Sequence, residues 1–275
     1  MRKLVTIKKY VVGIVMIMLL GGLCMSFGQK FDPAMLPFQA KEKLIYKIYY
    51  NLNFVWIPAG EVVFEVKDEG DLYHLEVTGR TYPSYEWFYK VRDKYHSYID
   101  KKTLLPKLYI RDVHQGGYRH YEKVVFDYQN KVMRSYLGKT MATTTLKEIP
   151  FTETNLYDLV SVMYFLRTID MNEFRNSKRV KFNMILDNEK YNLAIQFLED
   201  VQKLSVKDSG NFRAVSCKAE VVAGKVFEED AEMKIFIGDD ENKYPVMIET
   251  PIAVGSIKAV LKGVEWPKFR QHSKL

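Results

Sequence analysis

From residue 43 onward, apolar and polar residues alternate in short runs separated by Gly, Asn and Asp. In the run 122–128, Val124 and Phe126 are expected to point to one side and Val125 and Asp127 to the other. The same pattern predicts strands over 43–52, 60–67, 72–80, 91–100, 105–113, 118–128, 131–138 and 142–149, and again over 179–187, 190–199, 212–222, 231–239, 244–251 and 255–263. Because strand follows strand without a helix between them, we expect an antiparallel sheet with one wet face.

One stretch, residues 154–174, has the period of a helix instead. Its apolar residues recur at spacings of three and four: Leu156, Leu159, Val160, Met163 and Leu166. Asn155 is the expected N-cap, with Asp158 in the first turn. The pattern predicts a helix near 155–170, and the fold class is mainly β: a curved antiparallel sheet, half-barrel or barrel-like, wrapped around one central α-helix. Residues 29–42 and 265–275 are expected to be loose ends.

The N-terminus is typical of a secretory signal. A basic start with Arg2, Lys3, Lys8 and Lys9 precedes an apolar run over residues 10–25 and the small-x-small triplet 26–28. We expect cleavage after Gly28, which leaves residues 29–275 as a single domain in the periplasm or cell envelope. An uncleaved membrane anchor is the alternative. Acylation at Cys24 is a third interpretation, although Leu23 is a poor residue to precede a lipid-modified cysteine.

Removal of residues 1–28 lowers the net charge of the chain. The whole chain has 41 basic and 34 acidic residues, a net charge of +7. Without the four basic residues of the signal, 37 basic residues face 34 acidic ones, a net charge of +3. The remaining basic residues are scattered, so we expect no nucleic-acid partner. Cys217 is the one cysteine left and is expected to be buried as a small apolar residue.

The chain carries little recognisable catalytic chemistry. It has neither a G-x-S-x-G nor a phosphate-binding glycine loop. His114 and His120 flank a Gly-Gly turn, and Glu122 could add a third ligand, but the spacing matches no strong metal pattern. We therefore expect no metal and no cofactor. A hydrolase could still assemble two carboxylates, for which the candidates are Glu61, Asp93, Asp100 and Asp127.

Aromatic residues gather at two expected turns. The first, in residues 53–61 (NFVWIPAGE), carries Phe54 and Trp56, and the second carries Tyr85, Trp87 and Phe88. Such residues either cap one end of a sheet's core or line the mouth of an apolar cavity. The second interpretation makes these five residues the predicted ligand-binding site.

The order of several short motifs resembles the exported bacterial family catalogued as domain of unknown function 3108. These motifs are Leu44-x-Tyr46, Ala59-Gly60-Glu61, Val91-Arg92-Asp93 with Ser97, Leu105-Pro106, Phe126-Asp127 and Gly255-Ser256. The resemblance covers roughly residues 40–262 and implies an envelope protein of mostly antiparallel sheet, with no catalytic residues to carry over. More distantly, a curved sheet holding a helix is similar to the lipoprotein-carrier folds, whose concave face accepts acyl chains.

Three functions follow as hypotheses. The first is a non-enzymatic envelope protein that binds an apolar or amphipathic component such as a lipid or lipoprotein. The second is a hydrolase of envelope glycans that uses carboxylates. The third is an assembly or scaffold protein that presents a sheet edge to an envelope protein partner.

Overall fold

The computed structural model describes residues 30–52, 55–87, 89–220, 232–251 and 255–275. Contacts divide the chain into residues 1–30 and residues 31–275, and the second of these units holds the fold. The predicted signal segment, residues 1–28, lies outside the described residues.

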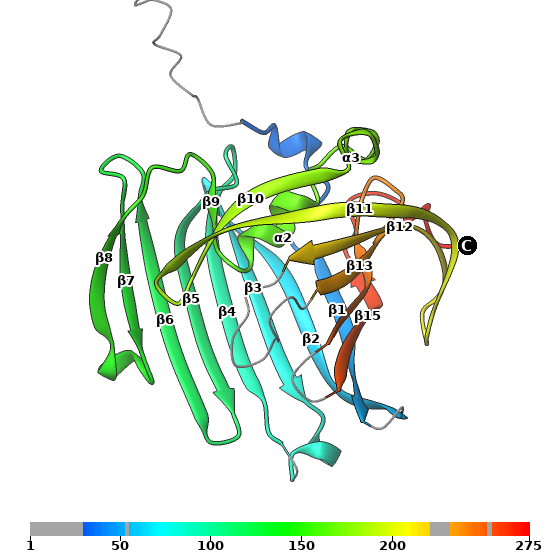
Figure 1. Cartoon of the computed structure of the whole chain (residues 1–275), viewed down its shortest axis with the longest axis horizontal. Coiled ribbons are helices and arrows are strands. Elements are labelled where there is room, and N and C mark those ends of the chain that lie inside the picture. The colour runs from blue at the N-terminus through cyan, green and yellow to red at the C-terminus, as the bar shows by residue number, and fades with distance from the viewer. Residues whose placement is uncertain (1–29, 53–54, 88, 221–231, 252–254) are drawn as a thin grey trace, which may run out of the picture. The chain divides into compact units, whose positions relative to one another are not determined.

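One large, curved and unclosed sheet organises the second unit (Figure 1). Its strands are β1 Lys43–Leu52, β2 Val55–Glu69, β3 Leu72–Thr81, β4 Arg92–Asp100, β5 Pro106–Gln115, β6 Tyr118–Asp127, β7 Val132–Gly138, β8 Thr145–Pro150, β9 Leu156–Tyr157, β10 Arg179–Leu186, β11 Glu189–Val206, β12 Gly210–Glu220, β13 Glu232–Gly238, β14 Pro245–Pro251 and β15 Ser256–Glu265. The strand order is β8-β7-β6-β5-β4-β3-β2-β1-β15-β14-β13-β12-β11-β10-β9. The pairs are antiparallel, except that β9 runs parallel to β10. This confirms the mainly β, curved antiparallel part of the predicted fold.

The predicted central helix is not confirmed. Residues 155–170 form strand β9, the short helix α2 (Ser161–Leu166) and a turn, and a second helix, α3, follows at Met171–Ser177. Asn155 is not the N-cap, because α2 begins only at Ser161. The Asp158 side chain accepts from the backbone amides of Val160 and Ser161 at 2.8 Å just before and at that start. The described part of the chain also forms three 3₁₀ turns: η1 Pro33–Met35, η2 Pro83–Tyr85 and η3 Met141–Thr143.

One face of the sheet is buried together with α2 in one core cluster, and we call it the inner face. It carries Leu75, Ile99, Tyr109, Val124 and Met133. The outer face carries the alternating residues, such as His74 and His96. Helices α2 and α3 also contribute to a second cluster with β10, β12 and β13, so this helical segment packs against both halves of the sheet. Two short helices therefore stand where one central helix was expected, and of the two only α2 contributes to both clusters.

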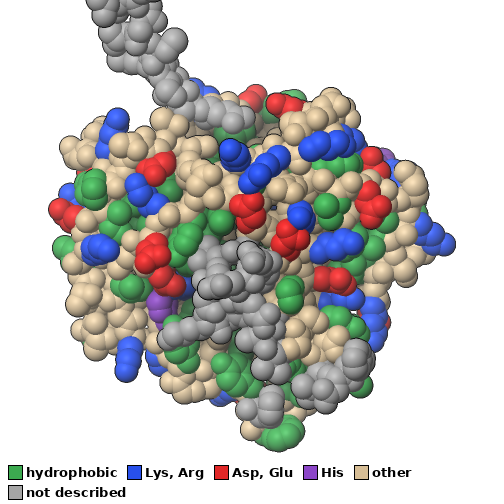
Figure 2. Space-filling view, viewed as in Figure 1, with side chains coloured by type: hydrophobic (Ala, Val, Ile, Leu, Met, Phe, Trp, Pro, Cys, Tyr) green, Lys and Arg blue, Asp and Glu red, His purple; other side chains and the backbone are tan. Residues whose placement is uncertain are grey.

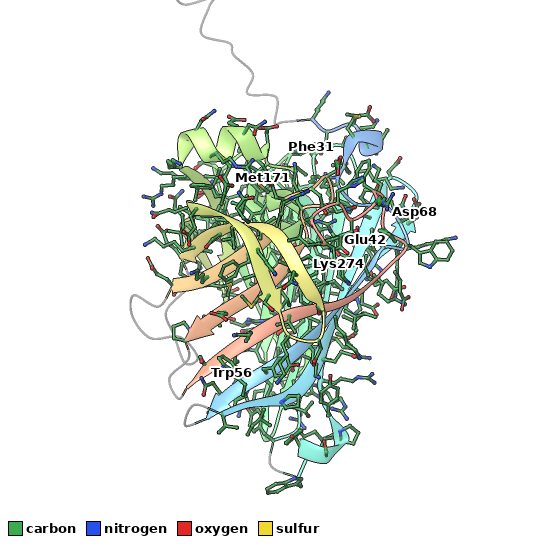
Figure 3. The ribbon with its side chains drawn as sticks, turned by 90° about the vertical axis from the view of Figure 1, so that its right-hand side faces the viewer. Phe31, Glu42, Trp56, Asp68, Met171 and Lys274 are labelled. Atoms are coloured by element: carbon green, nitrogen blue, oxygen red, sulfur yellow. The ribbon has the colours of Figure 1, made fainter. Side chains whose placement is uncertain are left out.

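The terminal segments are not the loose ends that the sequence predicted. Leu36 and Phe38 are buried in the first core cluster, and Ser273 near the C-terminus is 1% exposed. Arg167, at the end of α2, forms a buried ion pair with Glu42 that ties the N-terminal segment to the helix. Figure 3 places Glu42 and Trp56 toward opposite ends of the sheet, so this segment covers the end that lies away from Trp56.

The apolar stretch 53–61 is mostly strand. Strand β2 begins at Val55, and Trp56 and Ile57 pair with Asn51 and Tyr50 of β1. The apolar residues that were expected in a turn therefore extend the β1–β2 ladder. Residues 53 and 54 lie outside the described residues.

Candidate functional site

The three described residues of the predicted aromatic site occupy different environments. Trp56 is half-buried on β2, with the Lys258 Nζ 4.5 Å from its ring centroid. Tyr85 is the half-buried last residue of η2, and Trp87, two residues later, is 82% exposed. Phe54 and Phe88 lie outside the described residues.

A polar cluster on the inner face is the stronger candidate. Strands β5 and β6 pair Arg111 with Glu122 and Val113 with His120, so alternation places Arg111, His120 and Glu122 on the same face. Asp187 reaches them from the two-residue turn between β10 and β11. Both turn residues, Asp187 (φ 52°) and Asn188 (φ 67°), are left-handed, as a tight hairpin turn of this kind requires. We call Arg111, His120, Glu122 and Asp187 the Arg111 cluster.

The guanidinium of Arg111 is the centre of this cluster. Its Nη2 donates to Asp187 Oδ1 and contacts His120 Nε2, and its Nε lies 3.5 Å from Glu122 Oε2. His120 Nε2 is 3.2 Å from Asp187 Oδ1, and its Nδ1 is 3.3 Å from the Tyr118 hydroxyl. The cluster therefore brings one fixed cation, two acids and one imidazole together.

Several buried polar atoms in and beside the cluster have no hydrogen-bond partner among the described residues. They are Tyr109 Oη, Arg111 Nε, both carboxylate oxygens of Glu122, Ser135 Oγ and Asn188 Oδ1. Tyr109 and Ser135 pair with Val124 from the two neighbouring strands. On the same face of the sheet, the Arg111–Glu122 pair lies two residues further along β5 and β6. Buried polar atoms are normally paired, and each unpaired one costs about 1–3 kcal/mol. This concentration indicates a place where water or a ligand completes the hydrogen bonding.

The pKa values of the two acids of the cluster shift in opposite directions. Burial raises the pKa of Glu122, against a smaller opposing effect of Arg111. The hydrogen bond with His120 lowers the pKa of Asp187. Burial also raises the pKa of Tyr109 well above its ordinary range, so that the phenol keeps its proton. The site thus offers a cation, an anion and groups that can donate protons in hydrogen bonds.

A metal ion fits this cluster poorly. One ligand atom each from His120, Glu122 and Asp187 lie within 4.8 Å of one another. However, Arg111 already contacts all three residues and supplies the positive charge that a cation would bring. The sequence placed His114 near His120. His114 follows Val113, which pairs with His120, so its side chain faces the outer side of the sheet, where its Nε2 is 2.9 Å from Asp112 Oδ1.

The carboxylates proposed from the sequence do not converge. Glu61 pairs with Arg80 at 3.1 Å, and Asp93 accepts from the Gln115 side chain at 2.6 Å. Asp100 and Asp127 accept backbone amides in their own turns. The acids that do meet are Glu122 and Asp187. The sequence marked Glu122 only as a possible ligand and missed Asp187, whose one local signal is the Asp-Asn pair between two strands.

The outer face carries a cavity of about 480 Å³. Strands β1 to β4 line it with both apolar and charged side chains, among them Lys43, Glu61, Glu65, Arg80 and Val63. Its charges are largely paired within the sheet, as in Arg80–Glu61 at 3.1 Å and Lys43–Glu65 at 3.9 Å. On the face shown in Figure 2, acidic and basic side chains are likewise interspersed. We therefore rank this cavity below the Arg111 cluster.

Comparison with known proteins now supplies the family. The family model described as "Protein of unknown function (DUF3108)" matches residues 45–262, most of the chain. The chain belongs to the DUF3108 family. No curated protein matches this DUF3108 member. Among solved structures it is similar to a beta-barrel-like protein of domain of unknown function DUF1849 from Brucella abortus, with a TM-score of 0.51 and 8% identity over 82% of this chain and 96% of that one.

At that identity the similarity shows the fold alone, and it agrees with the curved sheet described above. Of the helices in the described ranges, none has the length and apolar character needed to cross a bilayer.

Proposed function

We propose that this DUF3108 protein is exported to the cell envelope and binds an amphipathic envelope component, such as a lipid or lipoprotein, on the inner face of its sheet. The observation that carries the proposal is the set of buried atoms around Arg111 that lack a hydrogen bond: Tyr109 Oη, Ser135 Oγ and the Glu122 oxygens, of which Oε2 has an ion pair with Arg111 Nε at 3.5 Å. A ligand head group with an anionic oxygen for Arg111 and an N–H or O–H for Glu122 would pair them.

The surroundings of the cluster suit the apolar part of such a ligand. Next to the polar groups on the same face lie Tyr95, Val113 and Leu137, by the register of β4 to β7. Tyr95 and Leu137 are half-buried, so they retain surface that a hydrocarbon chain could cover. A polar group set in apolar surroundings is the pattern expected for an amphipathic ligand.

The sequence supports a location of this protein in the cell envelope. A basic start, an apolar run over residues 10–25 and the triplet 26–28 support export with cleavage after Gly28. The lipoprotein-carrier folds, to which the sequence suggests a distant similarity, accept acyl chains on a concave face, and the curved sheet is consistent with that analogy.

Native mass spectrometry of the protein, extracted gently from its host, tests the proposal. We expect a bound lipid-sized molecule in the wild type and at least about a tenfold loss of occupancy in Arg111→Met. Arg119→Met is the matched control, because Arg119 is exposed on the neighbouring strand β6 and donates to the backbone carbonyls of Gly116 and Tyr118. A protein that emerges without a ligand, or equal occupancy in both variants, contradicts lipid binding.

A hydrolase of envelope glycans is the second candidate, and one observation favours it. The pKa of Glu122 is raised and that of Asp187 lowered, the separation expected of an acid and its ionised partner. Incubation with oligosaccharides from the cell wall should then release new reducing ends, and Glu122→Gln should abolish them. If neither binding nor hydrolysis is found, an assembly role remains, and cross-linking in intact cells should capture a defined protein partner.

A further inference from the structure

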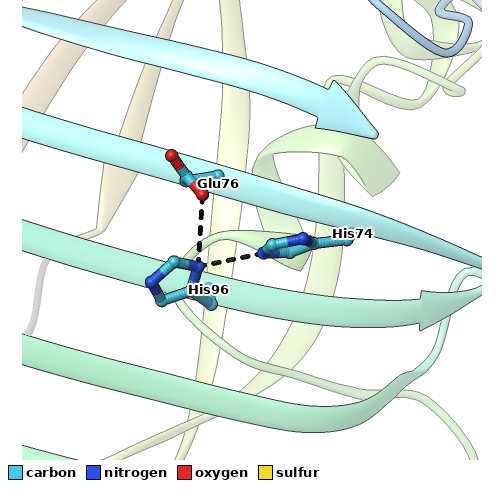
Figure 4. Close-up of side chains that lie close together, drawn as sticks. All are labelled: His74, Glu76 and His96. Atoms are coloured by element: carbon cyan, nitrogen blue, oxygen red, sulfur yellow. Dashed lines mark hydrogen bonds and ion pairs between the residues drawn. The ribbon is translucent and has the colours of Figure 1, made fainter. Parts of the chain in front are cut away.

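A second polar cluster lies on the outer face, on the strands β3 and β4. Glu76 pairs directly with His96 across the two strands, and His74 lies two residues before Glu76, on the same face. The His74 Nε2 and His96 Nδ1 are 2.9 Å apart, and His96 Nδ1 is 3.6 Å from Glu76 Oε2 (Figure 4). One ligand atom from each of the three residues lies within 4.8 Å of the others. The structure assigns to these residues a divalent zinc site.

The spacing suits tetrahedral zinc. Zinc binds imidazole nitrogen and carboxylate oxygen at about 2.0–2.2 Å, so two ligand atoms at a tetrahedral angle lie about 3.3 Å apart. The His74–His96 separation of 2.9 Å and the His96–Glu76 separation of 3.6 Å fall on either side of this value. Two histidines and one carboxylate leave a fourth position for water or another ligand, and the side chains of Glu76 and His96, each 24% exposed, give that position access to solvent.

The neighbours of His74 hold its ring as a metal ligand requires. Its Nδ1 is 3.0 Å from Glu69 Oε1, which keeps the proton on Nδ1 and leaves Nε2 as the free acceptor. The ring stacks on Tyr98 with centroids 4.3 Å apart and planes 8° from parallel, and the residue is 6% exposed. A carboxylate behind a buried, stacked imidazole is the usual arrangement around histidine ligands in metal proteins.

Lys67 opposes binding, because its Nζ donates to Glu76 Oε2 at 2.8 Å and places a positive charge beside the site. This contact gives the assignment a directional prediction: removal of the Lys67 charge should strengthen metal binding.

Isothermal titration of the full exported protein, stripped with EDTA, with Zn²⁺ tests the assignment, and Mg²⁺ serves as the contrasting ion. We expect one Zn²⁺ per chain, binding lost in His96→Ala, and affinity about 10–100-fold weaker in Glu69→Gln. Lys67→Met should bind about two- to fivefold more tightly. His114→Ala is the matched control, because His114 is an exposed histidine whose partner is Asp112, and its affinity should be unchanged.

Thermal unfolding without metal shows whether each variant is folded. Glu69→Gln and Lys67→Met both keep the buried His74 ring, so they test the site even if a histidine substitution unfolds the protein. Absence of Zn²⁺ binding in the wild type, or affinities that are equal across the wild type, His96→Ala and Glu69→Gln, would overturn the assignment. Loss of the binding in His120→Ala would also overturn it, because the ion would then lie in the Arg111 cluster.

Discussion

The substitution Arg167→Met should destabilise the protein by about 3–5 kcal/mol, because it leaves the Glu42 carboxylate buried without its partner. Arg167 is 2% exposed and Glu42 is fully buried. The two guanidinium nitrogens Nη1 and Nη2 donate to the carboxylate at 2.6 and 3.0 Å. Arg167 also donates to the backbone carbonyls of Pro37 at 2.9 Å and Asn242 at 3.1 Å. The substitution therefore removes one charge and four hydrogen bonds from a closed site.

The expected change in melting temperature follows from the size of the folded unit. An unfolding entropy of about 2.1 cal/mol/K per residue gives roughly 0.5 kcal/mol/K for about 245 residues. A loss of about 3–5 kcal/mol then lowers the melting temperature by roughly 6–10 °C. Urea denaturation followed by circular dichroism should give the free energy of unfolding, and calorimetry the melting temperature.

An exposed ion pair provides the matched control. Arg134 and Glu148 form one at 3.1 Å between neighbouring strands, and Arg134→Met should cost less than about 1 kcal/mol. The double variant Glu42→Gln, Arg167→Met should be more stable than the sum of the two single variants predicts, because neither charge is then left alone. If Arg167→Met costs no more than Arg134→Met, the Arg167–Glu42 pair does not hold the N-terminal segment as described.

Three further predictions concern the core and the backbone. Burial raises the pKa of Asp158 from 3.8 to about 6, so between these pH values the native state holds a proton that the unfolded chain has released. The free energy of unfolding should therefore fall by about 3 kcal/mol as the pH rises from 4 to 6. Urea titrations across this pH range should show the slope, and Asp158→Asn should flatten it. A Cβ at Gly60 would overlap the carbonyl oxygen of Arg80, so Gly60→Ala should lower the free energy of unfolding by about 1–3 kcal/mol in the same assay. Gly117→Ala is the control and should cost little, because a Cβ there meets nothing within 4 Å. Equal losses of stability in the two variants would contradict this packing. Cys217 is fully buried and its pKa is raised to about 12 by burial, so its thiol should react with a maleimide only after unfolding, and rapid labelling of the native protein would contradict its placement.

The strands were largely predictable because each depends on a local pattern. Strand β1 has the predicted bounds, and the predicted alternation in β6 is confirmed, with Val124 and Phe126 buried and Val125 and Asp127 less so. Cys217 is buried as expected. Strand β11 runs on to Val206, beyond its predicted end, through two register shifts against β12 that no local pattern signals.

The helix and the site were harder to predict because both depend on distant parts of the chain. Leu156 and Tyr157 pair with Asn183 and Met184 of β10, and this pairing removes them from the helix that their spacing favoured. Arg111 meets Asp187 across 76 residues of sequence. Neither residue has a local neighbour that indicates the contact, whereas Glu122 could be marked because it lies two residues from His120.

The most direct test of the proposed function is a crystal structure of the natively extracted protein at a resolution that separates water from ligand atoms. Our account predicts elongated density whose polar end lies within hydrogen-bond distance of Arg111, Glu122 and Tyr109 and whose remainder follows the inner face. Isolated water molecules at these atoms, with nothing extending from them, would contradict it.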